Sequence, residues 1–169
     1  MIVGIDSGKN GGIAVLHTNG AVSAFYRMPK LPGPKGDIDA ASIVEILRTT
    51  RDNCGGAEPA VVVIEALTRG AGKSSWTSAS VSGRIWGTIA GITQALGMPL
   101  EIVRAQDWQK IMLRGMKTDN YRARKDASLQ VAGRMFPDFA SLAGVRANDG
   151  VAESLLIAEY HRRMNVRKP

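Results

Sequence analysis

The sequence predicts an α/β domain in which a mixed β-sheet carries helices on both faces. Three observations predict it. The first 28 residues contain three short apolar segments separated by turn residues, which is typical of an antiparallel meander. A continuous β-branched run at 60–67 is typical of a strand buried on both faces. Segments with helical periodicity follow these strands. The length of 169 residues suits one domain, 1–169.

The meander accounts for the N-terminal sixth of the chain. IVGID (2–6) and GGIAVL (11–16) are the first two strands. The Asn-Gly pair in HTNGAV is a strong hairpin signal, so AVSAFYRM (21–28) is expected to be the third strand. A loop rich in Pro and Gly follows at 29–37.

The rest of the chain alternates between helices and strands. An amphipathic helix is expected at 39–53, with Asp39 as its N-cap. The strand AVVVIEAL (60–67) is followed by a loop, TRGAGKSS, and by a helix at 76–97 with many small residues. The remaining predicted elements are a strand at 99–104 and helices at 105–113, 121–136 and 148–164.

The composition excludes several classes of protein. With Cys54 as the single cysteine, no disulfide can form within the chain, and a reducing compartment is the default. No window of about 18 consecutive apolar residues occurs, so no segment is expected to cross a membrane. Asp6 and Lys9 interrupt the N-terminal apolar run, which lacks the features of a signal peptide. We therefore expect a cytoplasmic protein.

Basic residues concentrate in two segments. Residues 103–125 hold seven basic and two acidic residues, and residues 160–169 hold four basic and no acidic ones. The net charge of these two segments together exceeds the +7 of the whole chain, so the rest of the chain is slightly acidic. Such a distribution indicates a surface that binds a polyanion such as nucleic acid. The alternative is a solvated helix face with a basic tail.

Four acidic residues stand where the local pattern would not place them. Asp6 and Glu65 each end an apolar strand, and Asp149 and Glu153 lie near the start of the last helix. The i, i+4 spacing of the last two separates them by about 40° around the helix axis, so they share a face. Singly, each has an ordinary explanation: a turn cap, a partner for an arginine, a helix N-cap and a solvated helix residue.

Together, the four carboxylates predict a metal site. Carboxylates directed at a core repel each other and resist desolvation unless a cation pairs them. A set of ligands with oxygen and no sulfur suits Mg²⁺, with Mn²⁺ as a substitute. Two such ions about 4 Å apart activate a water and stabilise the leaving oxygen in phosphodiester hydrolysis. We therefore predict a nuclease with two ions in its site.

Four stretches of the chain resemble the RuvC family of Holliday-junction resolvases, especially its phage-type branch. They are VGIDSGKNGGIAVL, VVVIEAL, PLEIVRAQDWQKIML and NDGVAESLLIAEYHRR, and they follow the order of the family along nearly the whole chain. The resemblance implies an RNase H-like fold of the retroviral integrase superfamily and a homodimer. It also implies symmetric, Mg²⁺- or Mn²⁺-dependent nicking of a four-way junction in a bacterial cytoplasm.

The resemblance also implies roles for individual residues. Asp6, Glu65, Asp149 and Glu153 become the metal ligands, and Lys125 becomes a catalytic lysine near the scissile phosphate. One departure is the spacing of the last two acids, which is i, i+3 in the bacterial enzymes. Here Gly150 occupies the earlier of those positions and Asp149 precedes it.

A second departure concerns the loop after Glu65. The bacterial enzymes carry an aromatic residue there, whereas TRGAGKSS has none before Trp76. Arg69, Lys73 or Trp76 are therefore the candidates for opening the junction. Lys and Arg along 104–125 are expected to bind phosphates. The full set of predicted DNA-binding residues is Arg69, Lys73, Ser74, Lys110, Lys117, Arg122, Arg124 and Lys125.

The helix at 76–97 and the three tryptophans lead to predictions about oligomeric state and packing. The small residues of 76–97 would let this helix pack closely in a dimer interface, although they could equally pack within one subunit. A two-fold dimer suits a junction of near two-fold symmetry. Trp76, Trp86 and Trp108 are more readily explained as core or interface residues than as platforms for stacking bases.

Other functions are compatible with parts of this pattern. An RNase H-type nuclease for RNA–DNA hybrids, or another structure-specific nuclease, would share the fold. An actin-like ATP-binding module could use GIDSGKNGG as a phosphate loop. A second Gly-rich phosphate loop is missing from the sequence, however, so no nucleotide cofactor is expected. A catalytically inactive junction-binding protein would gain nothing from carboxylates that face phosphates.

Overall fold

A computed structural model describes residues 1–33, 37–54, 59–67, 76–145 and 148–166, and its centre is a five-stranded mixed sheet. The strand order is β3-β2-β1-β4-β5. The strands are β1 (Ile2–Asp6), β2 (Gly12–Leu16), β3 (Val22–Arg27), β4 (Val61–Glu65) and β5 (Leu100–Val103). The mixed α/β architecture predicted from the sequence is confirmed.

The first three strands form the predicted antiparallel meander. The turn between β2 and β3 uses the Asn-Gly pair, with Gly20 at a φ of 91°. Asn19 Oδ1 accepts a hydrogen bond from the amide of Ala21 over 3.0 Å, which holds that turn. β4 and β5 then add parallel to β1, so the carboxyl ends of β1, β4 and β5 meet at one edge of the sheet.

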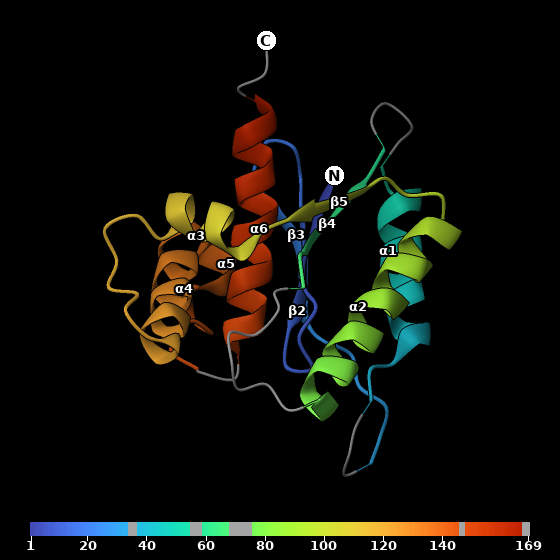
Figure 1. Cartoon of the computed structure of the whole chain (residues 1–169). Helices are drawn as coiled ribbons and strands as arrows, with labels where there is room; N and C mark the ends of the chain where they lie inside the picture. Colours follow the sequence, from blue (N-terminus) through green and yellow to red (C-terminus); the bar gives the residue numbers. More distant parts are fainter. Residues whose placement is uncertain (34–36, 55–58, 68–75, 146–147, 167–169) are drawn as a thin grey trace.

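Helices cover both faces of the sheet (Figure 1). α1 (Ala40–Asp52) and α2 (Trp76–Ala95) lie on one face. α3 (Ala105–Met112), α4 (Tyr121–Met135), α5 (Pro137–Ala140) and α6 (Asp149–Val166) lie on the other. Asp39 caps α1 as predicted, because its Oδ1 accepts from the amides of Ala41 and Ser42. The short α5 was missed, since four residues are too few to show helical periodicity.

The alternation of side chains along the strands divides the core in two. Val3 and Ile5 of β1 pack with Ile43 of α1 and Ile89 of α2 in one cluster. Ile2, on the opposite face of β1, packs in the other cluster with residues of α3, α4 and α6. The prediction that the β4 strand is buried on both faces is confirmed, because Val62, Val63 and Ile64 are fully buried. No helix of the described residues is long and apolar enough to span a membrane.

α6 lies in direct backbone contact with the sheet, and two glycines make this possible. A Cβ at Gly4 of β1 would lie 2.1 Å from the carbonyl oxygen of Ser154. A Cβ at Gly12 of β2 would lie 2.7 Å from the backbone of Val151. A side chain at either position would push α6 away. The glycines therefore bring the N-terminal turns of α6 against the ends of β1 and β2.

Candidate active site

Asp6 and Glu65 lie side by side at the carboxyl edge of the sheet. They follow Ile5 and Ile64, which are paired in the parallel register of β1 and β4. Ile5 and Ile64 pack toward α1 and α2. Alternation therefore turns the next side chain of each strand to the opposite face, which α6 and α3 cover. The two strand ends thus present both carboxylates to the same helices.

α6 adds Asp149 and Glu153 to this edge. Its first turn is tied to the sheet by a backbone bridge between Gly150 and Gly11. A Cβ at Gly150 would lie 2.4 Å from the carbonyl oxygen of Asn10, so no side chain can occupy this position without moving the helix. The position that carries the acid under an i, i+3 spacing is therefore closed to a side chain here, and Asp149, one residue earlier, is the acid in the first turn of α6.

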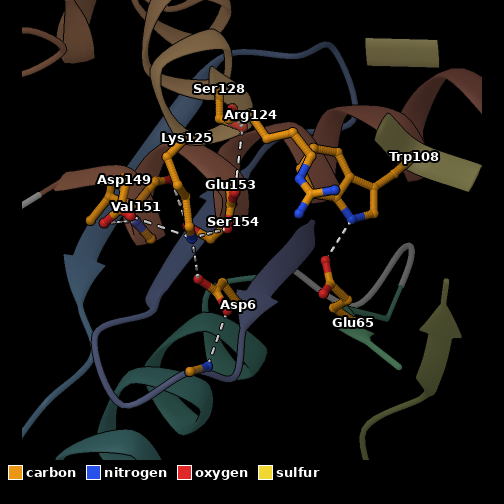
Figure 2. Close-up of polar contacts among 12 residues, drawn as sticks. Asp6, Glu65, Trp108, Arg124, Lys125, Ser128, Asp149, Val151, Glu153 and Ser154 are labelled. Carbon is orange, nitrogen blue, oxygen red and sulfur yellow. Dashed lines mark hydrogen bonds and ion pairs between the residues drawn. The ribbon is translucent and has the colours of Figure 1, made fainter. Parts of the chain in front are cut away.

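The ammonium of Lys125 lies among three of the four carboxylates (Figure 2). Its Nζ is 2.6 Å from Glu153 Oε2, 3.4 Å from Asp149 Oδ2 and 4.0 Å from Asp6 Oδ2. The exposed fraction of each of these four side chains is below 20%. Ser128, one turn along α4 from Lys125, donates its hydroxyl to Glu153 Oε1 over 3.4 Å. Carboxylates from β1 and α6, two elements far apart in the sequence, therefore converge on one cationic nitrogen of α4.

Burial dominates the electrostatics of this cluster. Loss of hydration and the negative charge of Asp6 raise the pKa of Glu153 to about 8, although Lys125 opposes the rise. Burial likewise raises the pKa of Asp6. Burial alone would lower the pKa of Lys125, but the charges of Glu153, Asp6 and Asp149 outweigh it and raise that pKa. One ammonium does not neutralise this many carboxylates, so the cluster favours an added proton or cation.

Glu65 is held separately from the lysine. Its Oε2 accepts a hydrogen bond of 2.7 Å from the indole Nε1 of Trp108, on α3. Burial raises the pKa of Glu65, the hydrogen bond from Trp108 lowers it, and the charge of Asp6 raises it further. Glu65 is therefore close enough to Asp6 for their charges to interact. Among the described residues, the partner of the Glu65 carboxylate is therefore an indole and not an arginine.

The chemistry of these side chains fits a hard divalent cation. All four acids supply carboxylate oxygens, which are the ligands that Mg²⁺ and Mn²⁺ prefer. In the described part of the chain no three His, Cys, Asp or Glu side chains already stand in a metal-holding arrangement. Lys125 occupies the space between three of the acids instead. The donor set thus fits such an ion, provided that the ammonium moves.

Two solved structures share this architecture over nearly the full chain. T. thermophilus RuvC in complex with a Holliday junction substrate aligns with a TM-score of 0.60 at 17% sequence identity, covering 99% of this chain and 98% of that chain. Thermus thermophilus RuvC aligns with a TM-score of 0.57 at 16% identity and the same coverage. The fold is RNase H-like, of the RuvC type. No family model and no curated protein matches the sequence.

The predicted DNA-binding residues are distributed unevenly on this RuvC-like fold. Arg69, Lys73 and Ser74, and the side chain of Trp76, lie outside the described residues. Lys110 is exposed and lines an open hollow of about 400 Å³ with Gln106, Gln109 and Thr118. The remaining predicted residues lie in the connection after α3 and in the first two turns of α4: Lys117, Arg122, Arg124 and Lys125.

These last four residues differ in exposure. Lys117 is 81% exposed and lies 3.5 Å from Asp119. Arg122 is exposed in the first turn of α4. Arg124 is half-buried and Lys125 belongs to the acidic cluster itself. Lys117 and Arg122 are thus exposed, whereas Arg124 and Lys125 are partly buried, and Lys125 contacts the carboxylates.

Sequence reasoning missed two residues that contact this cluster. Trp108 was expected to be a core or interface residue. It lies in the core with no exposed surface, and it also donates a hydrogen bond to Glu65. Ser128 contacts Glu153 from the same helix as Lys125. The signal for Ser128 was its spacing from Lys125, three residues along a helix, which places both on one face. No local signal identifies Trp108, because its contact joins positions 43 residues apart.

Proposed function

We propose that this protein is a structure-specific endonuclease that cuts branched DNA, four-way junctions above all, by metal-dependent phosphodiester hydrolysis. One observation carries the proposal: four acids and one lysine, from β1, β4, α4 and α6, gather at the carboxyl edge of a RuvC-like sheet. A structural ion pair needs one acid per base, whereas this cluster holds an excess of acids with raised pKa values.

Branched DNA as the substrate is also consistent with the similarity to solved structures. One of the similar structures is a RuvC bound to a Holliday junction substrate. The four stretches that resemble the phage-type branch support a further, finer assignment to that branch. The protein would then act in the cytoplasm of a bacterial host.

We expect Asp6, Glu65, Asp149 and Glu153 to hold two Mg²⁺ ions, or Mn²⁺ as a substitute. When bound, such ions supply an activated water and neutralise charge at the leaving oxygen. Lys125 competes for the same oxygens and has to leave its position among them. The ring of Tyr121 lies 5.7 Å from its Nζ and offers a second contact for the ammonium outside the cluster. From there Lys125 can contact a phosphate of the bound strand.

Basic residues on α3, α4 and the connection between them would bind the DNA backbone. Lys110, Lys117 and Arg122 are exposed and can each contact a phosphate. Arg124 and Lys125 lie nearer the acidic cluster and would contact the strand that is cut. Binding of this kind weakens as salt concentration rises, because each phosphate contact releases counterions.

The protein is proposed to act as a homodimer through α2. A Cβ added at Gly83, Gly87 or Gly91 would meet no described atom within 4 Å, so this glycine stripe faces open space. The core side of α2 is formed by Ile85 and Ile89 instead. Among the described residues these three glycines pack against nothing in their own subunit, which supports a dimer interface over the alternative of packing within one subunit. A second copy would cover them.

The proposal is tested by cleavage of synthetic substrates. A four-way junction, a fork and an RNA–DNA hybrid are incubated with the protein in Mg²⁺, Mn²⁺ or EDTA. We expect paired nicks in the junction with either ion and none in EDTA. Cleavage confined to the hybrid would favour the RNase H-type alternative. Asp6→Asn provides the matched control, because it should lose more than about 100-fold in rate while still binding the junction.

A further inference from the structure

Glu65 is held at both its backbone and its side chain by two tryptophans. Trp86 of α2 donates its indole Nε1 to the carbonyl oxygen of Glu65 over 3.0 Å. Trp108 of α3 donates its indole Nε1 to Glu65 Oε2 over 2.7 Å. Figure 2 shows this second bond, apart from the contacts that join Lys125 to Asp6, Asp149 and Glu153. The two bonds differ in what they fix: the first the end of strand β4, the second the carboxylate.

The indole of Trp108 is itself fixed. Its side chain has no exposed surface and packs in the core cluster beneath α4 and α6. An indole N–H can only donate, and a buried donor without a partner costs free energy. The bond to Glu65 is the one that satisfies it among the described residues. Because the ring cannot turn within the core, the bond determines where Oε2 lies.

We propose that Trp108 is a positioning residue, which holds the Glu65 carboxylate in the orientation that receives the divalent cation. The inference rests on the proposed function. A free glutamate has three rotatable side-chain bonds, and anchoring Oε2 removes most of this freedom while leaving Oε1 for the ion. Hydrogen-bonded partners of metal-ligating carboxylates commonly contribute 10- to 100-fold in metal affinity or activity.

The first test measures metal binding without catalysis. Mn²⁺ is titrated calorimetrically into the full-length wild-type protein, Trp108→Phe and the matched control Trp86→Phe. We expect Trp108→Phe to raise the Kd for Mn²⁺ by about 10- to 100-fold. Trp86→Phe removes the indole that bonds the backbone of Glu65 but leaves the bond from Trp108 to the Glu65 carboxylate. It should therefore change the Kd much less. Equal effects of both variants would overturn the inference, because they would reflect packing at the end of β4.

The second test separates positioning from structure. Cleavage of a four-way junction by Trp108→Phe should recover as the Mn²⁺ concentration rises, with the affinity for the junction in EDTA unchanged. A loss that excess Mn²⁺ does not recover would overturn the inference. Wild-type protein that neither binds Mn²⁺ nor cuts junctions would overturn the proposed function and this inference together. Wild-type protein that does both, beside a Trp108→Phe variant of equal Kd, would overturn the inference alone.

A third measurement gives a result even if the Trp108→Phe variant does not fold. The indole N–H resonance of Trp108 is followed by ¹⁵N NMR in metal-free protein and assigned by elimination with Trp76→Phe and Trp86→Phe. Glu65→Ala removes the acceptor, so this resonance should shift far more than that of Trp86, whose acceptor is the backbone. Addition of Mg²⁺ to wild-type protein should shift it as well. A Trp108 resonance that responds to neither change would overturn the inference.

Discussion

Lys125 determines the state of the acidic cluster in the metal-free protein. Its ammonium lies within 4.0 Å of three carboxylates from two other elements, and its side chain is only 16% exposed. A cation in this position stabilises carboxylates that would otherwise repel each other in a desolvated place. Under the proposed function, a divalent cation would bind the same carboxylate oxygens. Lys125 would then both stabilise the metal-free cluster and compete with that cation.

Replacement of Lys125 by methionine should separate these two effects. Lys125→Met keeps the aliphatic stem but removes the charge, so in EDTA the free energy of unfolding should fall by up to about 3 kcal/mol. Mg²⁺ should stabilise the variant more than it stabilises the wild-type protein. Junction cleavage should still fall by about 100-fold or more, since no ammonium reaches the phosphate. Urea unfolding with and without Mg²⁺, beside cleavage rates, checks this; equal stabilisation of both proteins by Mg²⁺ would contradict it.

Glu153 should make the stability of the metal-free protein depend on pH. Burial and the charge of Asp6 raise its pKa from 4.5 to about 8 in the folded protein. A carboxyl with a raised pKa stabilises the fold while it is protonated. This contribution is complete below pH about 4.5 and is lost as the pH rises to about 8, so the protein should become less stable over that range.

The pH dependence is measured by urea unfolding in EDTA between pH about 5 and about 8. Glu153→Gln imitates the protonated form, so its stability should vary less with pH than that of the wild-type protein. Mg²⁺ binds the ionised form and should stabilise the wild-type protein more at the upper end of the range. A wild-type stability that rises steadily toward pH about 8 in EDTA would show that Glu153 is already ionised at the lower end.

At the scale of elements, the close contact between α6 and the sheet brings the acids together. Sequence patterns predicted the strands and most helices, because apolar periodicity is a local property. They also located Asp6 and Glu65 at strand ends. They could not show that Lys125 lies among the carboxylates or that Trp108 bonds Glu65, because both contacts depend on how α3, α4 and α6 pack. Nor could they explain why residue 150 is a glycine. The backbone of Asn10 and Gly11 leaves no room there for a side chain.

The contact at Gly150 can be tested by adding a single methyl group. In Gly150→Ala the Cβ would lie 2.4 Å from the carbonyl oxygen of Asn10, so the first turn of α6 has to shift. We expect a loss of about 1–3 kcal/mol in stability and a loss of cleavage, because Asp149 moves with this turn. Gly144→Ala is the control, since its Cβ would meet no described atom within 4 Å. Equal thermal stability of the two variants would argue against the contact.

At the scale of the whole molecule, the two faces of the sheet would have different roles. α3, α4 and α6 cover one face (Figure 1), and the contacts of Lys125 with the acidic cluster lie on this face. The opposite face carries α2. A Cβ on its glycine stripe of Gly83, Gly87 and Gly91 would meet no described atom within 4 Å. A dimer formed through α2 would hold two acidic clusters in a fixed relation. Such a pair suits a substrate with two equivalent strands to cut.

Disruption of the glycine stripe should therefore convert paired nicking into single nicking. Gly87→Arg places a long charged side chain at the centre of the stripe, where a second helix could no longer approach. Gln130→Arg, at an exposed position of α4, adds the same charge on the other face. Light scattering should report a dimer for the wild-type protein and Gln130→Arg and a monomer for Gly87→Arg.

A supercoiled plasmid with an extruded cruciform distinguishes the two modes of cutting. Two nicks within the lifetime of one complex give linear plasmid, whereas one nick relaxes the supercoiling, reabsorbs the cruciform and leaves an open circle. Wild-type protein and Gln130→Arg should give linear product, and Gly87→Arg should give mainly open circles. Because the acidic cluster lies on the opposite face from α2, the affinity of Gly87→Arg for Mn²⁺ should stay at the wild-type level. A dimeric Gly87→Arg that still produces linear plasmid would place the interface elsewhere on the molecule.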